Sequence, residues 1–134
     1  MENQELSRVE KKRFSLVARI KSANHAWRGI RILFASGHNV WVYVFFSFVV
    51  IYLGTILGVS TTEWTILVLT MGVVFVTETI NTAIEIDMDL TSPSFHPYAR
   101  DTKDVAAGAA LLSVLMAMVI GVIIFLPKIY NIQG

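Results

Sequence analysis

Acidic side chains lie inside a long apolar run, and no other feature of this sequence constrains its fold as strongly. Residues 78–89 carry four of the ten acidic residues and continue a stretch that is typical of a membrane span. An α-helix turns about 100° per residue, so several polar residues of this range form one stripe about three turns long on the helix. It consists of Glu78, Asn81, Thr82, Glu85 and Asp89. Carboxylates in hydrocarbon cost at least ~2.5–3.5 kcal/mol and normally mark functional sites, although a packed helix with neutral or paired acids is the alternative.

The composition is that of a membrane protein. Hydrophobic residues make up 54% of the 134 residues and charged residues 16%. The absence of cysteine excludes disulfides and thiolate metal sites. The ranges 39–61, 64–89 and 105–127 are each long enough to cross a bilayer at about 1.5 Å per residue. We therefore predict an all-α membrane protein with one domain, 1–134, and three transmembrane helices at these ranges.

The segment before the first span predicts a helix that lies on the membrane surface. After a flexible N-terminus at 1–12, the range 13–35 places apolar residues on one helical face and basic residues on another. The apolar face consists of Leu16, Ile20, Ala23, Trp27, Ile30 and Phe34. A basic amphipathic helix with a tryptophan suits the membrane interface, and an ordinary helix that covers a core is the alternative.

The distribution of basic residues predicts the topology. Eight of the eleven Lys and Arg residues precede Ser36, so the positive-inside rule places the N-terminus in the cytoplasm. Three spans then put the polar loop 91–104 in the cytoplasm and the C-terminus outside. Glu78 lies about 21 Å along its helix from Trp64, within the hydrocarbon. The stripe therefore opens toward the compartment that holds ATP, and acids, Asn and Lys near a cytosolic loop fit phosphoryl transfer.

Several motifs carry a resemblance to a known family. They are Glu78-x-x-Asn81-Thr82-Ala83-Ile84-Glu85-x-x-x-Asp89, Pro93-x-x-His96-Pro97, Lys103-Asp104-x-Ala106-Ala107-Gly108-Ala109 and Ala26-Trp27-x-Gly29-x-Arg31. Over 15–127 the chain resembles the small prokaryotic integral-membrane lipid kinases, the diacylglycerol kinase and undecaprenol kinase family. The resemblance implies a homotrimer in the bacterial cytoplasmic (inner) membrane, with active sites between neighbouring protomers. It also implies Mg²⁺, ATP as co-substrate and a membrane lipid as substrate. We expect no nucleic-acid partner.

The resemblance also implies roles for individual residues. Glu78 resembles the general base that takes the proton of the lipid hydroxyl, and Glu85 resembles the Mg²⁺ ligand. Asn81 would orient the phosphates or the metal, and Lys103 resembles the γ-phosphate contact. The other expected contacts are Ser94, Phe95, His96, Asp104 and His25 for the nucleotide, and Trp27 and Arg31 for the lipid. A solvated side chain is the alternative for His25, and a solvated ion pair is the alternative for Asp89 and Arg100.

One position departs from the family pattern. The family commonly has a second metal-binding Glu where this chain has Gly37, and no acid occurs between Glu10 and Glu63. Three alternatives follow. Mg²⁺ is held by Glu85, water and ATP oxygens alone, His38 takes the place of the missing Glu as a metal ligand, or the kinase activity is weak. Mg²⁺ often keeps several waters, which favours the first alternative, and hard–soft chemistry disfavours His38.

These features predict an ATP-dependent lipid kinase. The segments that follow Thr91 and Asp104 are closer to the undecaprenol kinase branch, with diacylglycerol a close second. One alternative is a small oligomeric transporter in which Glu78 binds a proton or cation, but this leaves the Lys103-Asp104 pair unused. A non-catalytic membrane scaffold is another alternative, which the missing acid at Gly37 leaves open.

Overall fold

The computed structural model describes residues 16–37 and 39–132, and within these ranges the chain is helical with no β-strand. The helices are α2 (Leu16–Ser36), α3 (Val40–Ile56), α4 (Thr61–Thr91) and α5 (Pro97–Ile132). The chain divides into a first unit that ends at Ile32 and a second unit that begins at Leu33. We describe each unit by itself. The prediction of an all-α protein is confirmed.

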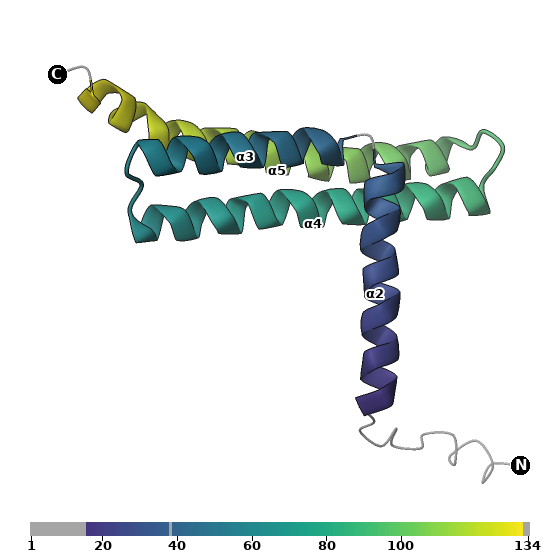
Figure 1. Cartoon of the computed structure of the whole chain (residues 1–134). Coiled ribbons are helices and arrows are strands. Elements are labelled where there is room, and N and C mark those ends of the chain that lie inside the picture. The colour runs from purple at the N-terminus through teal and green to yellow at the C-terminus, as the bar shows by residue number, and fades with distance from the viewer. Residues whose placement is uncertain (1–15, 38, 133–134) are drawn as a thin grey trace, which may run out of the picture. The chain divides into compact units, whose positions relative to one another are not determined.

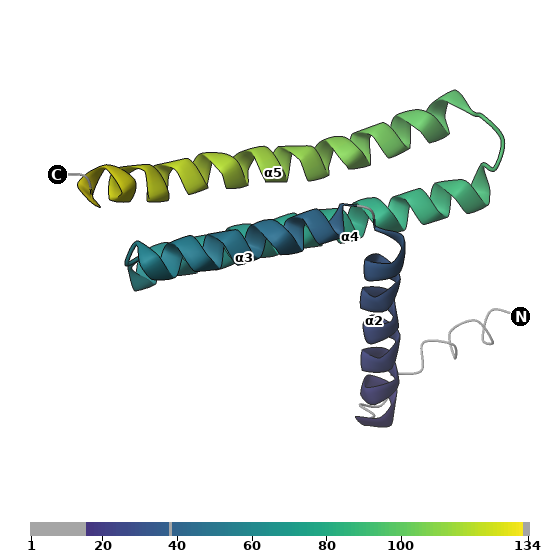
Figure 2. The same ribbon diagram turned by 45° about the horizontal axis from the view of Figure 1, so that its top comes forward.

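The second unit is a bundle of three helices. In both views, α4 and α5 run side by side in opposite directions, and α3 contacts both of them (Figures 1 and 2). Both α4 and α5 are long and apolar enough to cross a membrane. With its 17 residues, α3 is near the lower limit for a membrane span. If α3 and the preceding helix are counted together as one span, the number of candidate spans rises from two to three. The chain is therefore a membrane protein.

The connection between α3 and α4 is fixed by two helix caps. Gly58 has a φ of 63°, and the Val59 N–H bonds to the Gly54 carbonyl at 3.1 Å, which ends α3. Ser60 then starts α4: its hydroxyl accepts from the Glu63 N–H, and the Glu63 carboxylate accepts from the Ser60 N–H at 2.7 Å. These caps explain why α3 ends at Ile56, before the expected residue 61, and why α4 begins three residues before the expected residue 64.

The loop expected over 91–104 is shorter in the structure. Only 92–96 is non-helical, because α4 continues to Thr91 and α5 begins at Pro97. Pro93 disfavours a helical backbone at Ser92, and Pro97 suits the first turn of a helix, where its missing N–H costs nothing. As a result Lys103 and Asp104 stand on a helix, and their positions relative to α4 depend on helix packing.

A small apolar core closes the end of the bundle that contains the α3–α4 connection. Its buried members are Val59, Leu67, Ile124 and Phe125, and partly buried side chains that include Trp64 pack against them. The Lys128 Nζ and a Glu63 carboxylate oxygen pair at 3.0 Å across the same end. Many other large apolar side chains are exposed, as expected for helices that meet lipid or further chains.

The first unit contains most of α2. The Arg31 guanidinium lies 6.0 Å from the centre of the Trp27 ring. Ile20, Trp27 and Ile30, which belong to the expected apolar face, are exposed. The position of this helix at the membrane interface stays a prediction, and the flexible N-terminus expected at 1–12 lies outside the described residues.

Packing at Gly54 generates a stability prediction. A Cβ atom there would lie 2.6 Å from Cη2 of the Trp64 ring, whereas a Cβ at Gly72 on α4 would meet nothing within 4 Å. Gly54→Ala should lower the free energy of unfolding by about 1–3 kcal/mol through overpacking. The matched control, Gly72→Ala, should keep or slightly raise it. Thermal unfolding in detergent micelles measures both, and equal stability of the two variants would contradict the described Trp64 contact.

Candidate active site

The polar stripe of α4 faces the interior of the bundle. Glu78, Asn81 and Thr82 are buried, with exposed fractions of 3%, 5% and 7%. Glu85 is partly buried and Asp89 is exposed. The intervals of three and four residues put these side chains on one side of the helix. Toward the 92–96 connection, the stripe therefore changes from buried to solvent-accessible.

A pocket of about 280 Å³ lies between α3, α4 and α5, and we call it the acidic pocket. It is lined by Asn39, Val42, Tyr43, Glu78, Asn81, Glu85, Ala107, Ala110, Leu111 and Val114. The two alanines on α5 leave space beside the carboxylates. The structure thus brings three residues of the stripe, Glu78, Asn81 and Glu85, into one pocket.

Two hydrogen bonds organise the polar side chains of the acidic pocket. The Tyr43 hydroxyl donates to Oε2 of Glu78 at 3.3 Å. Asn81 Nδ2 donates to Oε1 of Glu85 at 3.1 Å. The oxygen of the same amide, Asn81 Oδ1, is buried and has no hydrogen-bond partner in the described part of the chain. A buried oxygen without a partner is uncommon and is often explained by an ion or water.

The same oxygens fit a hard divalent cation. Amide and carboxylate oxygens are the ligands that Mg²⁺ prefers, and Mg²⁺ usually takes only one or two carboxylates and keeps several waters. Asn81 Oδ1 and the Glu85 carboxylate provide such a donor set. Among the described residues, no three His, Asp or Glu side chains gather closely enough to hold a metal by themselves. Asn81 and Glu85 therefore fit Mg²⁺ only in part, and a bound ion would need further ligands.

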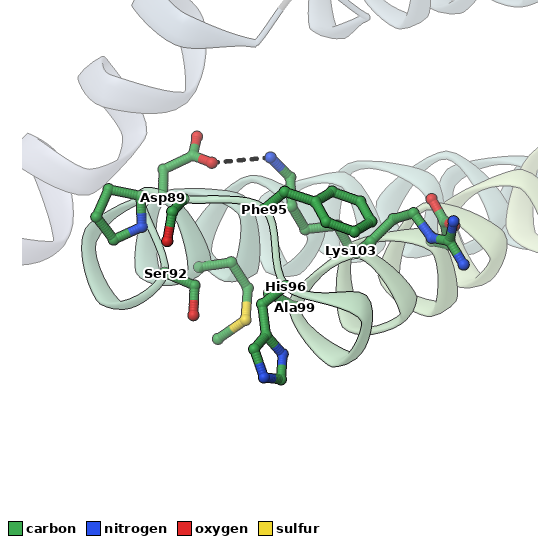
Figure 3. A pocket seen from close by; sticks show the side chains of 11 residues that line it. Asp89, Ser92, Phe95, His96, Ala99 and Lys103 are labelled. Atoms are coloured by element: carbon green, nitrogen blue, oxygen red, sulfur yellow. Dashed lines mark hydrogen bonds and ion pairs between the residues drawn. The ribbon is translucent and has the colours of Figure 1, made fainter.

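A second pocket, of about 300 Å³, lies where α4 meets α5 around the 92–96 connection, and we call it the loop pocket (Figure 3). Ser94, Phe95, His96, Lys103 and Asp104, which we expect to bind the nucleotide, all line it. Lys103 Nζ pairs with an Asp89 carboxylate oxygen at 2.9 Å, and Figure 3 shows this pair joining the two helices. Their role in nucleotide binding stays a prediction.

The two pockets follow one another along the same pair of helices. On α4, Glu85 of the acidic pocket precedes Asp89 of the loop pocket by one turn. On α5, Ala107 of the acidic pocket follows Lys103 of the loop pocket by one turn. The negative charges of Asp89 and Glu85 both attract the Lys103 ammonium group. A ligand with several negative charges could therefore contact the cation of one pocket and, through a metal ion, the oxygens of the other.

Of the remaining expected residues, Arg100 also lines the loop pocket. His25, Trp27 and Arg31 belong to α2 in the first unit, where all three are exposed. Arg100 pairs with its neighbour Asp101 at 3.2 Å, and both side chains are largely exposed. His38 lies outside the described residues.

Gly37 offers no side chain where the family commonly has its second acid. Its backbone φ is not in the left-handed region, so conformational freedom does not explain the glycine. A Cβ at this position would lie only 2.6 Å from the Leu33 carbonyl oxygen, to which the Gly37 N–H donates at 2.8 Å. The backbone approach therefore leaves no space for a longer side chain without a local shift.

The contribution of α3 to the acidic pocket was not predicted from the sequence. Asn39 and Tyr43 line it, and the Ser47 hydroxyl donates to the Tyr43 carbonyl at 2.8 Å. Asn39, the residue before α3, and Tyr43 and Ser47 within it occur at intervals of four, which places them on one face. That spacing is the signal that could have identified a second polar stripe opposite the acidic one.

The chain is similar in sequence to known proteins. The sequence model described as prokaryotic diacylglycerol kinase matches residues 24–125. The chain is 38% identical over 109 residues to an undecaprenol kinase of Bacillus subtilis, covering 81% of this chain and 89% of that protein. It is 34% identical over 113 residues to a diacylglycerol kinase of Synechocystis, covering 84% of this chain and 65% of that protein.

These similarities favour neither the transporter nor the scaffold. The family match includes α3, α4 and most of α5, and therefore both pockets. The names of the relatives agree that the reaction is phosphoryl transfer to a lipid alcohol, with ATP implied as the co-substrate. The chain belongs to the prokaryotic diacylglycerol kinase family and is a lipid kinase of the membrane.

Proposed function

We propose that this protein transfers the γ-phosphoryl group of ATP to the hydroxyl of undecaprenol, with Glu78 as the general base. The observation that carries the proposal is the burial of the Glu78 carboxylate in a pocket that it shares with Asn81 and Glu85. A base at this depth can meet a lipid hydroxyl that remains within the membrane. Lys103 stands farther along the same helix pair, where it can contact phosphate.

The chemical step needs little more than positioning and charge. Glu78 accepts the proton of the lipid hydroxyl, the hydroxyl oxygen forms a bond to the γ-phosphorus, and the bond to the bridging oxygen of ADP breaks. Lys103 contacts the γ-phosphate and exchanges its pairing with Asp89 for the phosphate charge. Asn81 and Glu85 would hold Mg²⁺, which supplies neutralisation of phosphate charge when bound.

The remaining nucleotide contacts belong to the loop pocket and to α2. Ser94, Phe95, His96 and Asp104 line the loop pocket and would surround the nucleotide. The resemblance adds His25 to the nucleotide contacts. It places Trp27 and Arg31 at the lipid, and the exposed Trp27 ring with the nearby Arg31 cation suits a headgroup.

Undecaprenol is preferred to diacylglycerol on similarity. The undecaprenol kinase relative aligns over 89% of its length at 38% identity, and the Synechocystis diacylglycerol kinase over 65% at 34%. The segments that follow Thr91 and Asp104 favour the same branch. Diacylglycerol stays the second candidate because both lipids present a hydroxyl at the membrane surface.

We place the protein in the bacterial cytoplasmic membrane as a homotrimer with active sites between protomers. The resemblance supports this assembly, and the exposed apolar side chains of α3, α4 and α5 provide surface for lipid and for other copies. The basic residues before Ser36 support a cytoplasmic N-terminus and an outer C-terminus. The loop pocket then faces the cytoplasm, where ATP is available.

The activity is tested by phosphate transfer from labelled ATP to pure lipids. The purified protein should phosphorylate undecaprenol, and diacylglycerol more slowly. Glu78→Gln should lower turnover by roughly 10²–10⁴-fold because the base is lost. Wild-type turnover in the Gln variant would show that another group takes the proton. Faster phosphorylation of diacylglycerol would reverse the assignment of the substrate.

Metal and phosphate binding are tested by two alanine variants. Glu85→Ala should raise the Mg²⁺ concentration needed for activity, and Lys103→Ala should raise KM for ATP, each by roughly tenfold or more. Asp87→Ala, an exposed acid two residues from Glu85, and Lys128→Ala, a lysine at the far end of α5, are the matched controls. A variant whose Mg²⁺ and ATP dependence equals that of its control removes the residue from the site.

The topology is tested by cysteine labelling, because the chain has no cysteine of its own. In intact cells an impermeant thiol reagent should label Thr62→Cys, at the exposed outer end of α4, and spare Ser94→Cys. After permeabilisation both should react. Thr62 is preferred to Ser60, whose hydroxyl caps α4. Labelling of the residue 94 variant alone in intact cells would place the loop pocket on the side without ATP.

A further inference from the structure

Tyr43 is a polar side chain that the proposed reaction leaves without a role. It lies in α3, which has no charged residue, and its hydroxyl donates to Oε2 of Glu78 at 3.3 Å. Among the described residues, Tyr43 is the only side chain that hydrogen-bonds to Glu78. This distance is longer than is usual for a bond between two oxygens, and long hydrogen bonds are common in catalytic sites before substrate binds.

The surroundings of Tyr43 fix its ring. The ring packs edge-on against Phe75 of α4, with the centroids 6.4 Å apart and the planes at 88°. An aromatic pair in this arrangement is favourable beyond its buried area. Phe75 and Glu78 both belong to α4, so the helix that carries the carboxylate also holds the Tyr43 ring. None of the described residues that line the acidic pocket is a cation, so among them the Tyr43 hydroxyl is the group that orients Glu78.

Tyr43 also lies where two pockets meet. An apolar pocket of about 300 Å³, lined largely by aliphatic and aromatic side chains of α3, α4 and α5, shares Val42, Tyr43 and Val114 with the acidic pocket. A hydrocarbon chain is the ligand class that such a lining suits. A lipid whose chain occupied the apolar pocket would present its hydroxyl close to the ring edge of Tyr43 and to Glu78.

We infer that Tyr43 is a positioning residue for Glu78, which holds one carboxylate oxygen so that the other faces the lipid hydroxyl at the junction of the two pockets. The inference rests on the proposed role of Glu78 as the base. Oε2 accepts the bond from Tyr43, and Oε1 is left to take the proton of the lipid. Tyr43 keeps its own proton throughout. Without the bond, the Glu78 side chain can rotate among rotamers that point Oε1 away from the substrate.

Tyr43→Phe tests this role, because it removes the hydroxyl and keeps the ring on Phe75. We expect kcat to fall roughly tenfold, with KM for ATP changed by less than about twofold and the melting temperature in detergent unchanged. Tyr52→Phe is the matched control on α3: Tyr52 is 65% exposed, and kcat should not change. Wild-type kcat in Tyr43→Phe would overturn the inference, and so would a loss of kcat that follows a lowered melting temperature.

The double variant separates positioning from general packing. In the Glu78→Gln background, Tyr43→Phe should cost less than about twofold in residual turnover, because no base remains to be oriented. Equal losses in the two backgrounds would show that Tyr43 acts independently of Glu78 and would overturn the inference. If Glu78→Gln alone retained wild-type turnover, the proposed function of Glu78 would fail, which is a different outcome from normal kcat in Tyr43→Phe.

Discussion

The burial of one carboxylate, that of Glu78, is the constraint on which the bundle depends. A carboxylate that faced hydrocarbon would be costly, and the three helices avoid this by enclosing it. Each helix makes a different contribution: α3 supplies the Tyr43 donor, α4 adds the polar Asn81, and α5 presents small residues such as Ala110 that leave room for the pocket. A larger side chain on α5 at this level would fill part of the acidic pocket, in which we propose that the lipid hydroxyl meets the phosphate.

The caps and prolines at the two ends of the bundle set the register that joins its pockets. Ser60 and Glu63 fix where α4 starts, and Pro93 and Pro97 fix where it stops and α5 begins. Between these points the Asp89–Lys103 pair can form only if the two helices keep their present alignment. A slip of one turn, about 5.4 Å, would separate Lys103 from the pocket that holds Glu85. The alignment of the two pockets therefore depends on residues at the ends of the helices.

The sequence predicted best what repeats within one helix. The spacing of Glu78, Asn81 and Glu85 placed them on one face, and the structure brings them into one pocket. The pairing between helices was not predictable. The four-residue spacing of polar residues around Tyr43 indicates a polar face on α3, but it does not identify Glu78 as the partner. The contact of Trp64 with Gly54 leaves no periodic signal in either helix. The observed helix ends differ from the expected ones because a cap ends a helix wherever it occurs, whatever the length of the apolar stretch. Gly58, for example, ends α3 before the apolar stretch is complete.

Gly37 shows how backbone packing restricts the metal chemistry that we propose. A Cβ at this position would contact the Leu33 carbonyl oxygen at 2.6 Å, so a carboxylate there would require the end of α2 to shift. The chain instead offers the Glu85 carboxylate and Asn81 Oδ1, which no described residue pairs with, on residues separated by one helical turn. Two protein oxygens leave most of the coordination sphere of Mg²⁺ to water and phosphate. Because ATP brings phosphate oxygens, we expect the metal and the nucleotide to bind together. Lys103 and the other residues of the loop pocket would then orient the nucleotide.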